Sequence, residues 1–266
     1  MKTNCDDLLG EYRALADLCD TLTPAQWQTP TDFYGWTPWD EIAHLAYFDE
    51  TALQAATDVA AFAAGKQALS QQMARGEEIS AVARAHFSGV DGPALVVRWR
   101  RNHEALVAAL ALLDPKARLP WYGPDMSARS FATARLMETW AHGQDIWDVL
   151  GRTRGVSPGL RHIAHLGVTT YGWTFVNRQL PVPQPAPYVD LVAPDGSHWT
   201  WGEPSTSDCV TGPALDFALL VTQRRHRDDT ALHWSGDGAE RWTAIAQCFA
   251  GSPADGPAPG VRGRAR

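Results

Sequence analysis

Apolar residues recur every three or four positions through most of residues 1–180, which is the spacing of amphipathic helices. The helices predicted from this spacing cover residues 4–22, 37 or 38 to about 64, 77–113 with a bend near 89–93, 127–150, and 157–180. Thr37 can cap the second helix, Pro38 suits its first turn, and Asp40 lies where a capping-box acid is expected. Ser157 is the predicted cap of the fifth helix, and Gly151 suits the end of the fourth.

The pattern changes at residues 181–187, PVPQPAP, where every second residue is proline. Neither a helix nor a central strand can continue through such a run. Beyond it, YVDLVAPDGSHWTW alternates apolar and polar residues and predicts two strands joined by a turn at 194–196. A helix that begins at 211–213 and runs through ALDFALLVTQRR, a strand in DTALHWSG and a helix in GAERWTAIAQCFAG follow.

These elements predict two domains of different class. Residues 1–180 are expected to form an up-down bundle of four or five helices, and 181–187 a Pro-rich linker. Residues 188–250 are expected to form a small α+β domain. The tail, 251–266, is rich in Gly, Pro and Arg and is predicted to be disordered.

Composition narrows the function classes. The 266 residues are 45% hydrophobic and include 12 Trp, enough for a sizeable core. A net charge of -7 argues against a surface that neutralises nucleic-acid phosphates. No run of eighteen apolar residues and no signal-peptide pattern occurs, so neither a membrane span nor secretion is expected. The four cysteines lack CxxC spacing, which fits the cytoplasm and a structural role for each.

The segment METWAHGQD, residues 137–145, places three polar groups on one helix face. Glu138, His142 and Asp145 are spaced by four and three residues and interrupt a stripe that is otherwise small and apolar. The opposite face is apolar as well, so the helix is expected to be buried on two sides. A carboxylate in such a place needs a partner.

A second imidazole is expected near this face. His44 shares a face of the second predicted helix with Asp40, Tyr47 and Phe48. Two histidines and one glutamate from facing helices would form a divalent-metal site with open positions for water or substrate. Asp40 and Asp145 would then hold the ring nitrogens that face away from the metal.

Ordinary structural explanations stay open for each of these groups. A Glu and a His four residues apart also form a common helix-surface pair, and spacing alone does not show that the two helices face each other. His103, His162 and His165 could approach the same cavity or simply lie on polar or core faces. The basic run in VTQRRHRDD could clamp a carboxylate or sulfonate, or be solvated; it contains Arg224, Arg225 and Arg227.

Three parts of the chain together resemble the mycothiol-dependent maleylpyruvate isomerase family, within the larger group of DinB-like four-helix metalloproteins. They are GWTPWDEIAHLAYFDETAL, METWAHGQDIWDVLG, and a Pro-rich link into a small domain that ends in a GDG segment. The resemblance implies a divalent metal, usually zinc, held by His44, Glu138 and His142. It also implies a sterol-carrier-like second domain that offers Arg224 or Arg225 to the substrate, although VTQRR departs from the family's Gly-Arg pattern.

The resemblance further implies that the metal activates the thiol of mycothiol, or in relatives of bacillithiol or glutathione, for attack on an electrophilic small molecule. A thiol with a pKa of about 8.5 is mostly protonated at neutral pH, and a bound dication deprotonates it. We therefore expect a thiol-dependent isomerase or S-transferase, acting as a monomer or dimer. The alternatives are a hydrolase that uses water activated by the metal, and a non-catalytic protein that binds a metal or a small ligand.

Overall fold

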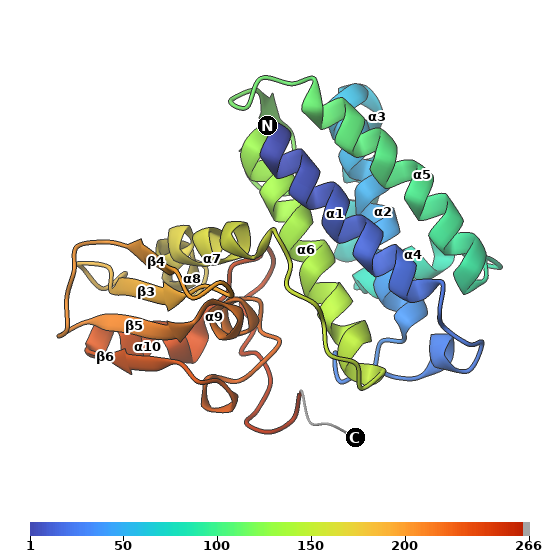
Figure 1. Ribbon diagram of the computed structural model, residues 1–266. Helices are drawn as coiled ribbons and strands as arrows, with labels where there is room; N and C mark the ends of the chain where they lie inside the picture. The colour runs from blue at the N-terminus through green and yellow to red at the C-terminus, as the bar shows by residue number, and fades with distance from the viewer. Residues whose placement is uncertain (263–266) are drawn as a thin grey trace. The chain divides into compact units, whose positions relative to one another are not determined.

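The computed structural model of the chain describes residues 1–262 and divides into two compact units (Figure 1). The first unit is Met1–Arg152, and the second begins at Thr153. Each unit has its own core and is described by itself. In the described residues, no helix is both long and apolar enough to cross a lipid bilayer.

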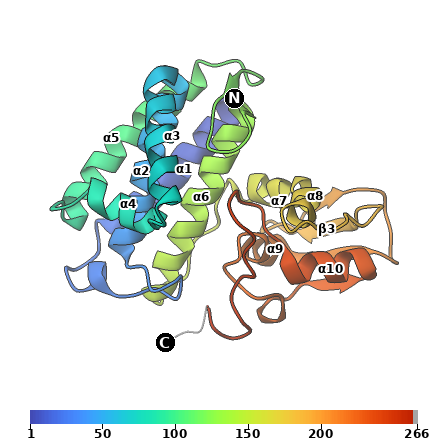
Figure 2. The same ribbon diagram turned by 180° about the vertical axis from the view of Figure 1, so that it is seen from behind.

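The first unit is built from helices and one small ribbon. Its elements are α1 (Lys2–Cys19), a 3-10 turn (Gln26–Gln28), α2 (Pro38–Thr57), α3 (Val59–Ala74), α4 (Ile79–His86), α5 (Gly92–Ala111), the antiparallel strands β1 (Arg118–Leu119) and β2 (Met126–Ser127), and α6 (Ala128–Val149). Helix α1 packs against α5 and α6, and α2 packs against the same two helices. The result is a four-helix bundle, with α3 and α4 against α2, as Figure 2 shows from behind.

Helices α1 and α6 run in the same direction. Near the start of both, the Asn4 side-chain amide donates to Thr133 Oγ1 at 3.3 Å. Just beyond their ends, Arg152 Nη1 donates to Thr21 Oγ1 at 2.8 Å. Two contacts at corresponding ends are compatible only with parallel helices.

Helices α2 and α5 are parallel to each other and antiparallel to α1 and α6. Trp39 Nε1 donates to the carbonyl of Val90 at the start of this pair, and Arg98 Nε donates to Glu50 Oε1 farther along. Because α2 and α5 point the same way, the chain needs a long connection between them, which α3 and α4 supply. The bundle order is thus up, down, down, up rather than a simple alternation.

The end of α2 differs from the sequence expectation. Its start is confirmed: Thr37 and Asp40 form a capping box, and Pro38 occupies the first turn. The helix ends at Thr57 instead of continuing to about residue 64, because Asp58 leaves the helical conformation and its carboxylate caps α3 through the amide of Ala61. The predicted helix was in fact two.

A single buried carboxylate joins the four helices of the bundle. Asp49 of α2 is 0% exposed and accepts from Tyr12 Oη of α1 at 2.7 Å, Trp99 Nε1 of α5 at 2.7 Å, and Arg135 Nε of α6 at 2.8 Å. Burial alone would lower the pKa of Arg135, but Asp49 and Tyr12 raise it above its ordinary value. The guanidinium therefore stays charged, and the ion pair is fully enclosed.

His103 of α5 lies beside this carboxylate. Its ring stacks on Tyr12 with centroids 4.4 Å apart and meets Trp99 edge-on. The side chain is 1% exposed, and Nδ1 has no hydrogen-bond partner among the described residues. Burial lowers the pKa of His103 to about 4, and the charge of Asp49 opposes this only in part.

The second unit combines a mixed sheet with short helices. Its elements are α7 (Leu160–Thr169), α8 (Tyr171–Val176), β3 (Tyr188–Val192), β4 (His198–Trp201), β5 (Cys209–Pro213), α9 (Ala214–Val221), a 3-10 turn (Arg227–Asp229), β6 (His233–Ser235) and α10 (Asp237–Ile245). The strand order is β4-β3-β5-β6, with β3 and β5 parallel and the other pairs antiparallel. Residues of β3 alternate between buried and more exposed positions, so one face of the sheet holds the core.

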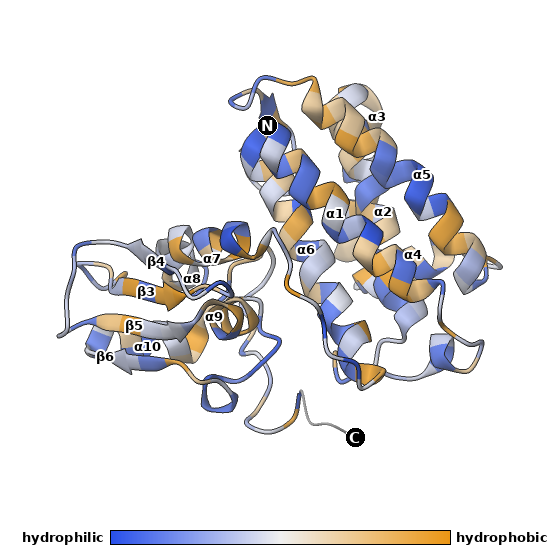
Figure 3. Ribbon diagram, in the orientation of Figure 1, coloured by the Kyte–Doolittle hydropathy of each residue, from blue (hydrophilic) through white to orange (hydrophobic). Residues whose placement is uncertain are grey.

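The two strands and the turn predicted within 188–201 are present, and the strand predicted in DTALHWSG, residues 229–236, is β6, but β5 was missed. Residues 211–213 belong to this strand, and the helix begins only at Ala214. Strand β5 pairs with β3 in parallel, a contact between distant segments that local periodicity does not reveal. Both β3 and α9 carry mainly apolar residues (Figure 3).

The boundary between the units lies after Arg152, whereas the sequence analysis placed it at 181–187. Helices α7 and α8 therefore belong to the second unit. Gly167 of α7 gives the physical reason, because a Cβ there would lie 2.8–2.9 Å from side-chain atoms of Val221 and Phe217 on α9. The missing side chain lets α7 pack directly on α9. The helix expected over 157–180 is also divided at Thr170 and starts at Leu160 rather than at a Ser157 cap.

The described part of the tail makes specific contacts with the second unit. The amide of Gly260 donates to both oxygens of Asp229, and Arg262 Nη1 donates to the carbonyl of Gln223 at 2.7 Å. Residues 251–262 are therefore held in place, unlike the disordered tail that composition predicts. Residues 263–266 of that predicted tail lie outside the described residues.

Removing the charge of Asp49 should destabilise the bundle strongly. Asp49→Asn would leave Arg135 as an uncompensated buried charge, which typically costs about 3–5 kcal/mol. Urea denaturation of purified protein measures this loss. Arg100→Gln is the matched control, since it breaks ion pairs with Asp17 and Asp20 at the surface and should cost less than about 1 kcal/mol. Similar losses in the two variants would contradict the role assigned to Asp49.

His103 should make the fold sensitive to acid. Its folded pKa lies below its unfolded value, so its contribution is complete above pH 6.5 and is lost as the pH falls towards about 4. The expected loss is about 3 kcal/mol over this window. His103→Phe keeps the stacked ring and removes the titration, so urea unfolding at pH 7 and about pH 4 should show a smaller acid loss in the variant. Equal losses in both proteins would refute this assignment.

Candidate metal centre

The three residues predicted as metal ligands lie together in the first unit. His44 comes from the second turn of α2, and Glu138 and His142 are one turn apart on the antiparallel helix α6. One ligand atom from each of the three lies within 4.8 Å of the other two. The helix faces inferred from the sequence therefore do face each other.

The distances within this triad differ from ordinary hydrogen bonds. Glu138 Oε2 lies 3.4 Å from His142 Nε2 and 3.7 Å from His44 Nε2. Protein N–H···O bonds are usually about 2.7–3.2 Å long. Two ligands of a tetrahedral ion with bonds of about 2.0–2.1 Å are about 3.4 Å apart. The spacing thus suits three donors arranged around one small cation.

The triad is only partly exposed to solvent. The His142 side chain is 6% exposed, whereas those of His44 and Glu138 are 13% and 24% exposed. Burial would raise the pKa of Glu138, but its interactions with His142 and His44 outweigh this and hold the pKa well below its usual range. Glu138 is therefore an anion at neutral pH, as a metal ligand must be.

The second nitrogen of His142 meets a carboxylate that the sequence analysis did not name. His142 Nδ1 lies 2.7 Å from Glu41 Oε2, and Glu41 is 0% exposed. Glu41 lies on the same helix face as Leu45, Phe48 and Ala52, which are apolar. An acidic residue at the start of such an apolar face is a sequence signal that the acid is buried. Asp145, expected to support a ligand, is also buried and offers an oxygen close to His142 and Glu41.

Asp40 has a different role from the one expected. Its Oδ2 accepts from the amide and hydroxyl of Thr37, and its Oδ1 accepts from Arg84 Nε at 2.6 Å. These bonds at the start of α2 use both oxygens for capping and ion pairing. Within the described residues, His44 Nδ1 is buried without a hydrogen-bond partner, so Asp40 does not support that ring.

Aromatic rings surround the two imidazoles. Trp36 stacks on His142 with centroids 5.8 Å apart and lies 5.3 Å from His44. Phe33 meets His142 edge-on at 5.3 Å, and Phe48 lies 4.8 Å from His44. All three aromatic side chains are half-buried. They give the triad an apolar rim, which strengthens electrostatic interactions inside it.

The protein's cysteines lie elsewhere. Cys5, Cys19 and Cys248 are buried, and Cys209 on β5 is half-buried. Burial raises the pKa of Cys5 and, more strongly, that of Cys19, so both are poor thiolates. None of the four belongs to a potential metal-ligand group in the described residues.

The remaining histidine candidates do not join the triad. His103 lies beside Asp49, as described above. His162 and His165 belong to α7 of the second unit, where His165 Nδ1 accepts from Trp201 Nε1 at 3.1 Å. The metal-ligand groups found in the described residues contain none of these three.

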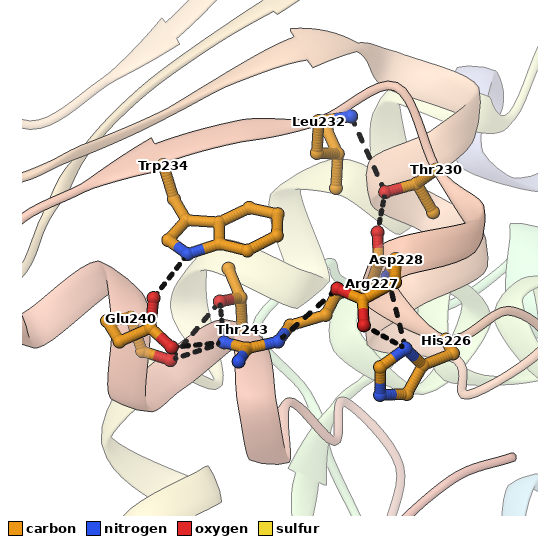
Figure 4. Close-up of polar contacts among 8 residues, drawn as sticks. All are labelled: His226, Arg227, Asp228, Thr230, Leu232, Trp234, Glu240 and Thr243. Atoms are coloured by element: carbon orange, nitrogen blue, oxygen red, sulfur yellow. Dashed lines mark hydrogen bonds and ion pairs between the residues drawn. The ribbon is translucent and has the colours of Figure 1, made fainter. Parts of the chain in front are cut away.

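The arginines of the predicted basic cluster have separate environments in the second unit. Arg224 is buried and donates from Nη1 to the carbonyl of Thr222, while Arg225 is half-buried and donates to the carbonyl of Arg224. Arg227 instead pairs with Glu240 at 2.7 Å and lies over the ring of Trp234 (Figure 4). Arg227 therefore links β6 to α10 through its contacts with Trp234 and Glu240.

The arrangement suits one kind of chemistry. Two imidazoles and one carboxylate that are partly exposed can hold a divalent ion and leave a position for a further ligand. Buried carboxylates of Glu41 and Asp145 lie close to His142 and can orient its ring.

Comparison with known proteins gives a family match for the first unit. The model of the mycothiol maleylpyruvate isomerase N-terminal domain family matches residues 8–147. This range includes His44, Glu138 and His142 and ends close to the boundary between the units. Two uncharacterized proteins of Mycobacterium tuberculosis, from strains CDC 1551 and H37Rv, are each 41% identical to this chain over 250 residues, 94% of this chain and 96% of theirs.

Two solved structures share the fold. They are crystal structures of the mycothiol-dependent maleylpyruvate isomerase and of a histidine-to-alanine mutant of it, each with a TM-score of 0.56. They are 16% and 15% identical in sequence and cover 85% of this chain and 90% of their own. The predicted fold class, a helical bundle followed by a small α+β domain, is confirmed.

Proposed function

Because the chain belongs to the mycothiol maleylpyruvate isomerase N-terminal domain family, we propose that it is a metal-dependent enzyme that uses a low-molecular-weight thiol. His44, Glu138 and His142 hold a divalent cation, for which zinc fits the donor set best. Mycothiol is the co-substrate, and the reaction is isomerisation of an electrophilic double bond or transfer of the thiol onto an electrophile.

The observation that carries this proposal is the convergence of three ligand atoms within 4.8 Å from two antiparallel helices. Two further features support it. Glu138 is ionised, since its pKa lies well below its usual range, and the side chains of Glu138 and His44 are partly exposed to solvent. The donors therefore fit a small dication that also binds an external ligand.

The metal ligands and the surrounding aromatic rings would have different roles in such a reaction. A bound dication would lower the pKa of a thiol and so supply a thiolate at neutral pH. The neighbouring rings of Phe33, Trp36 and Phe48 exclude water from the nucleophile and its electrophile. The chain's own cysteines are poor candidates for this thiol, because none of the four belongs to the metal-ligand groups of the described residues and burial raises the pKa of Cys5 and Cys19.

The second unit supplies a candidate for substrate recognition. Arg225 is half-buried, and its guanidinium is a planar fork of five N–H donors, one of which binds the carbonyl of Arg224. A guanidinium can bind a substrate carboxylate through two parallel hydrogen bonds. Arg224, the other candidate, is buried, so a role for it would be to support Arg225.

Loss of His142 should abolish metal binding and thiol-dependent turnover together. His142→Ala removes one of three ligands, and we expect less than stoichiometric zinc by metal analysis together with loss of mycothiol consumption in the presence of maleylpyruvate or another electrophile. His86→Ala is the control, because His86 pairs with Glu50 at the surface. Full activity in His142→Ala, or turnover of the wild-type protein without added thiol, would contradict the proposal.

Arg225 should affect binding of an anionic substrate more than turnover. With maleylpyruvate as substrate, Arg225→Gln should raise KM about tenfold or more, since a hydrogen bond to a charged group contributes about 1.5–3 kcal/mol. Steady-state kinetics at saturating mycothiol measures this change. Arg227→Gln serves as control because Arg227 is paired with Glu240. An unchanged KM in Arg225→Gln would remove Arg225 from the substrate site.

A further inference from the structure

Glu41 is a buried acid that the proposed ligand set leaves unused. It lies on α2, one turn before His44, and is completely enclosed. Its two carboxylate oxygens meet different groups. Oε2 lies 2.7 Å from His142 Nδ1 on α6, and Oε1 accepts a hydrogen bond of 3.3 Å from Thr31 Oγ1 in the loop before α2.

The contact with His142 defines which ring nitrogen faces the triad. The contact lies at Nδ1, where an imidazole N–H can donate to a carboxylate oxygen, so it assigns the hydrogen of the neutral His142 ring to Nδ1. Nε2 is then the nitrogen that points towards Glu138 Oε2. A carboxylate that holds the outer nitrogen of an imidazole in this way fixes the ring and makes its other nitrogen a better donor to a metal.

The contact with Thr31 reaches the aromatic loop. The amide of Thr31 donates to the carbonyl of Trp36 at 2.7 Å, and Thr31 Oγ1 accepts from the amide of Phe33 at 3.1 Å. The turn between them uses positive φ angles at Tyr34 and Gly35, +50° and +71°. Thr31 thus closes the loop that places the rings of Phe33 and Trp36 against His142.

We propose that Glu41 is a positioning residue that orients His142 for the metal and, through Thr31, couples this ligand to the loop 31–36. The inference rests on the proposed function and adds a role for a residue outside the ligand set. The Glu41 carboxylate contacts both His142 and Thr31. A change in the orientation of His142 is therefore transmitted to the loop that carries Phe33 and Trp36. The loop becomes more rigid when the metal is bound.

The first test compares zinc affinity in metal-free protein by competition with a chromophoric chelator. Glu41→Gln keeps the size and an acceptor oxygen but removes the charge, and it should weaken zinc binding about tenfold, at the lower end of the effect known for such supporting groups. Glu41→Ala also loses the acceptor and should weaken binding about 100-fold. Thr31→Val leaves the Glu41–His142 contact in place but removes the hydroxyl that donates to Glu41 Oε1 and accepts from the amide of Phe33, so it should weaken zinc binding less than Glu41→Gln does.

The second test measures the coupling by hydrogen exchange of a peptide that spans residues 31–36. In the wild-type protein, zinc should slow exchange of the amides of Thr31 and Trp36. In Glu41→Gln and Thr31→Val, zinc should slow it less, even at saturating zinc. If the substitutions only loosened the loop, they would speed amide exchange in residues 31–36 by the same factor with and without zinc. That result would contradict the proposed coupling.

Each outcome decides between the two proposals. Glu41→Gln that is folded by circular dichroism and binds zinc with wild-type affinity would overturn the role of Glu41 while leaving the metal site intact. Wild-type protein that binds zinc, with the expected losses in the variants but no thiol-dependent turnover, would overturn the proposed function and support the role of Glu41. Wild-type protein that binds no zinc would overturn both.

Discussion

The buried ion pair between Asp49 and Arg135 sets the register of α2 against α6, and the candidate metal centre depends on that register. Asp49 and Arg135 meet at one level of the bundle, and Glu41 and His142 meet about two turns away. On α2, His44 lies between Glu41 and Asp49. On α6, Glu138 lies between Arg135 and His142. A slip of one helix by a turn would separate both pairs, so the same contacts that stabilise the bundle also hold the three ligand atoms together.

The sequence predicts that these three side chains lie together because helical periodicity specifies which residues share a helix face. His44, Glu138 and His142 follow from polar residues that interrupt apolar stripes, and the structure places them within reach of one ion. Periodicity does not reveal which residue of a neighbouring helix meets a given nitrogen. For that reason Asp40, four residues before His44 on the same helix face, was expected in a supporting role, although its oxygens are used at the start of α2.

Contacts between distant segments explain the other differences. Strand β5 is specified by parallel pairing with β3, and α7 is assigned to the second unit by the close packing of Gly167 on α9. Neither contact can be recognised from the local sequence. The proline run at 181–187 can, and for this reason the boundary was expected there instead of after Arg152. The arginines show the same limit: a basic run in sequence separates into a buried, a half-buried and an ion-paired side chain.

The long connection through α3 and α4 has a consequence for biosynthesis. It places His44 early in the chain and Glu138 and His142 near the end of the first unit, although they lie side by side in the folded bundle. A chain emerging from the ribosome can assemble this centre only after α6 has been synthesised, since domains fold largely as units during synthesis. Incomplete chains that stop before α6 therefore cannot form the full set of ligands, and loading of an ion would mark chains whose first unit is complete.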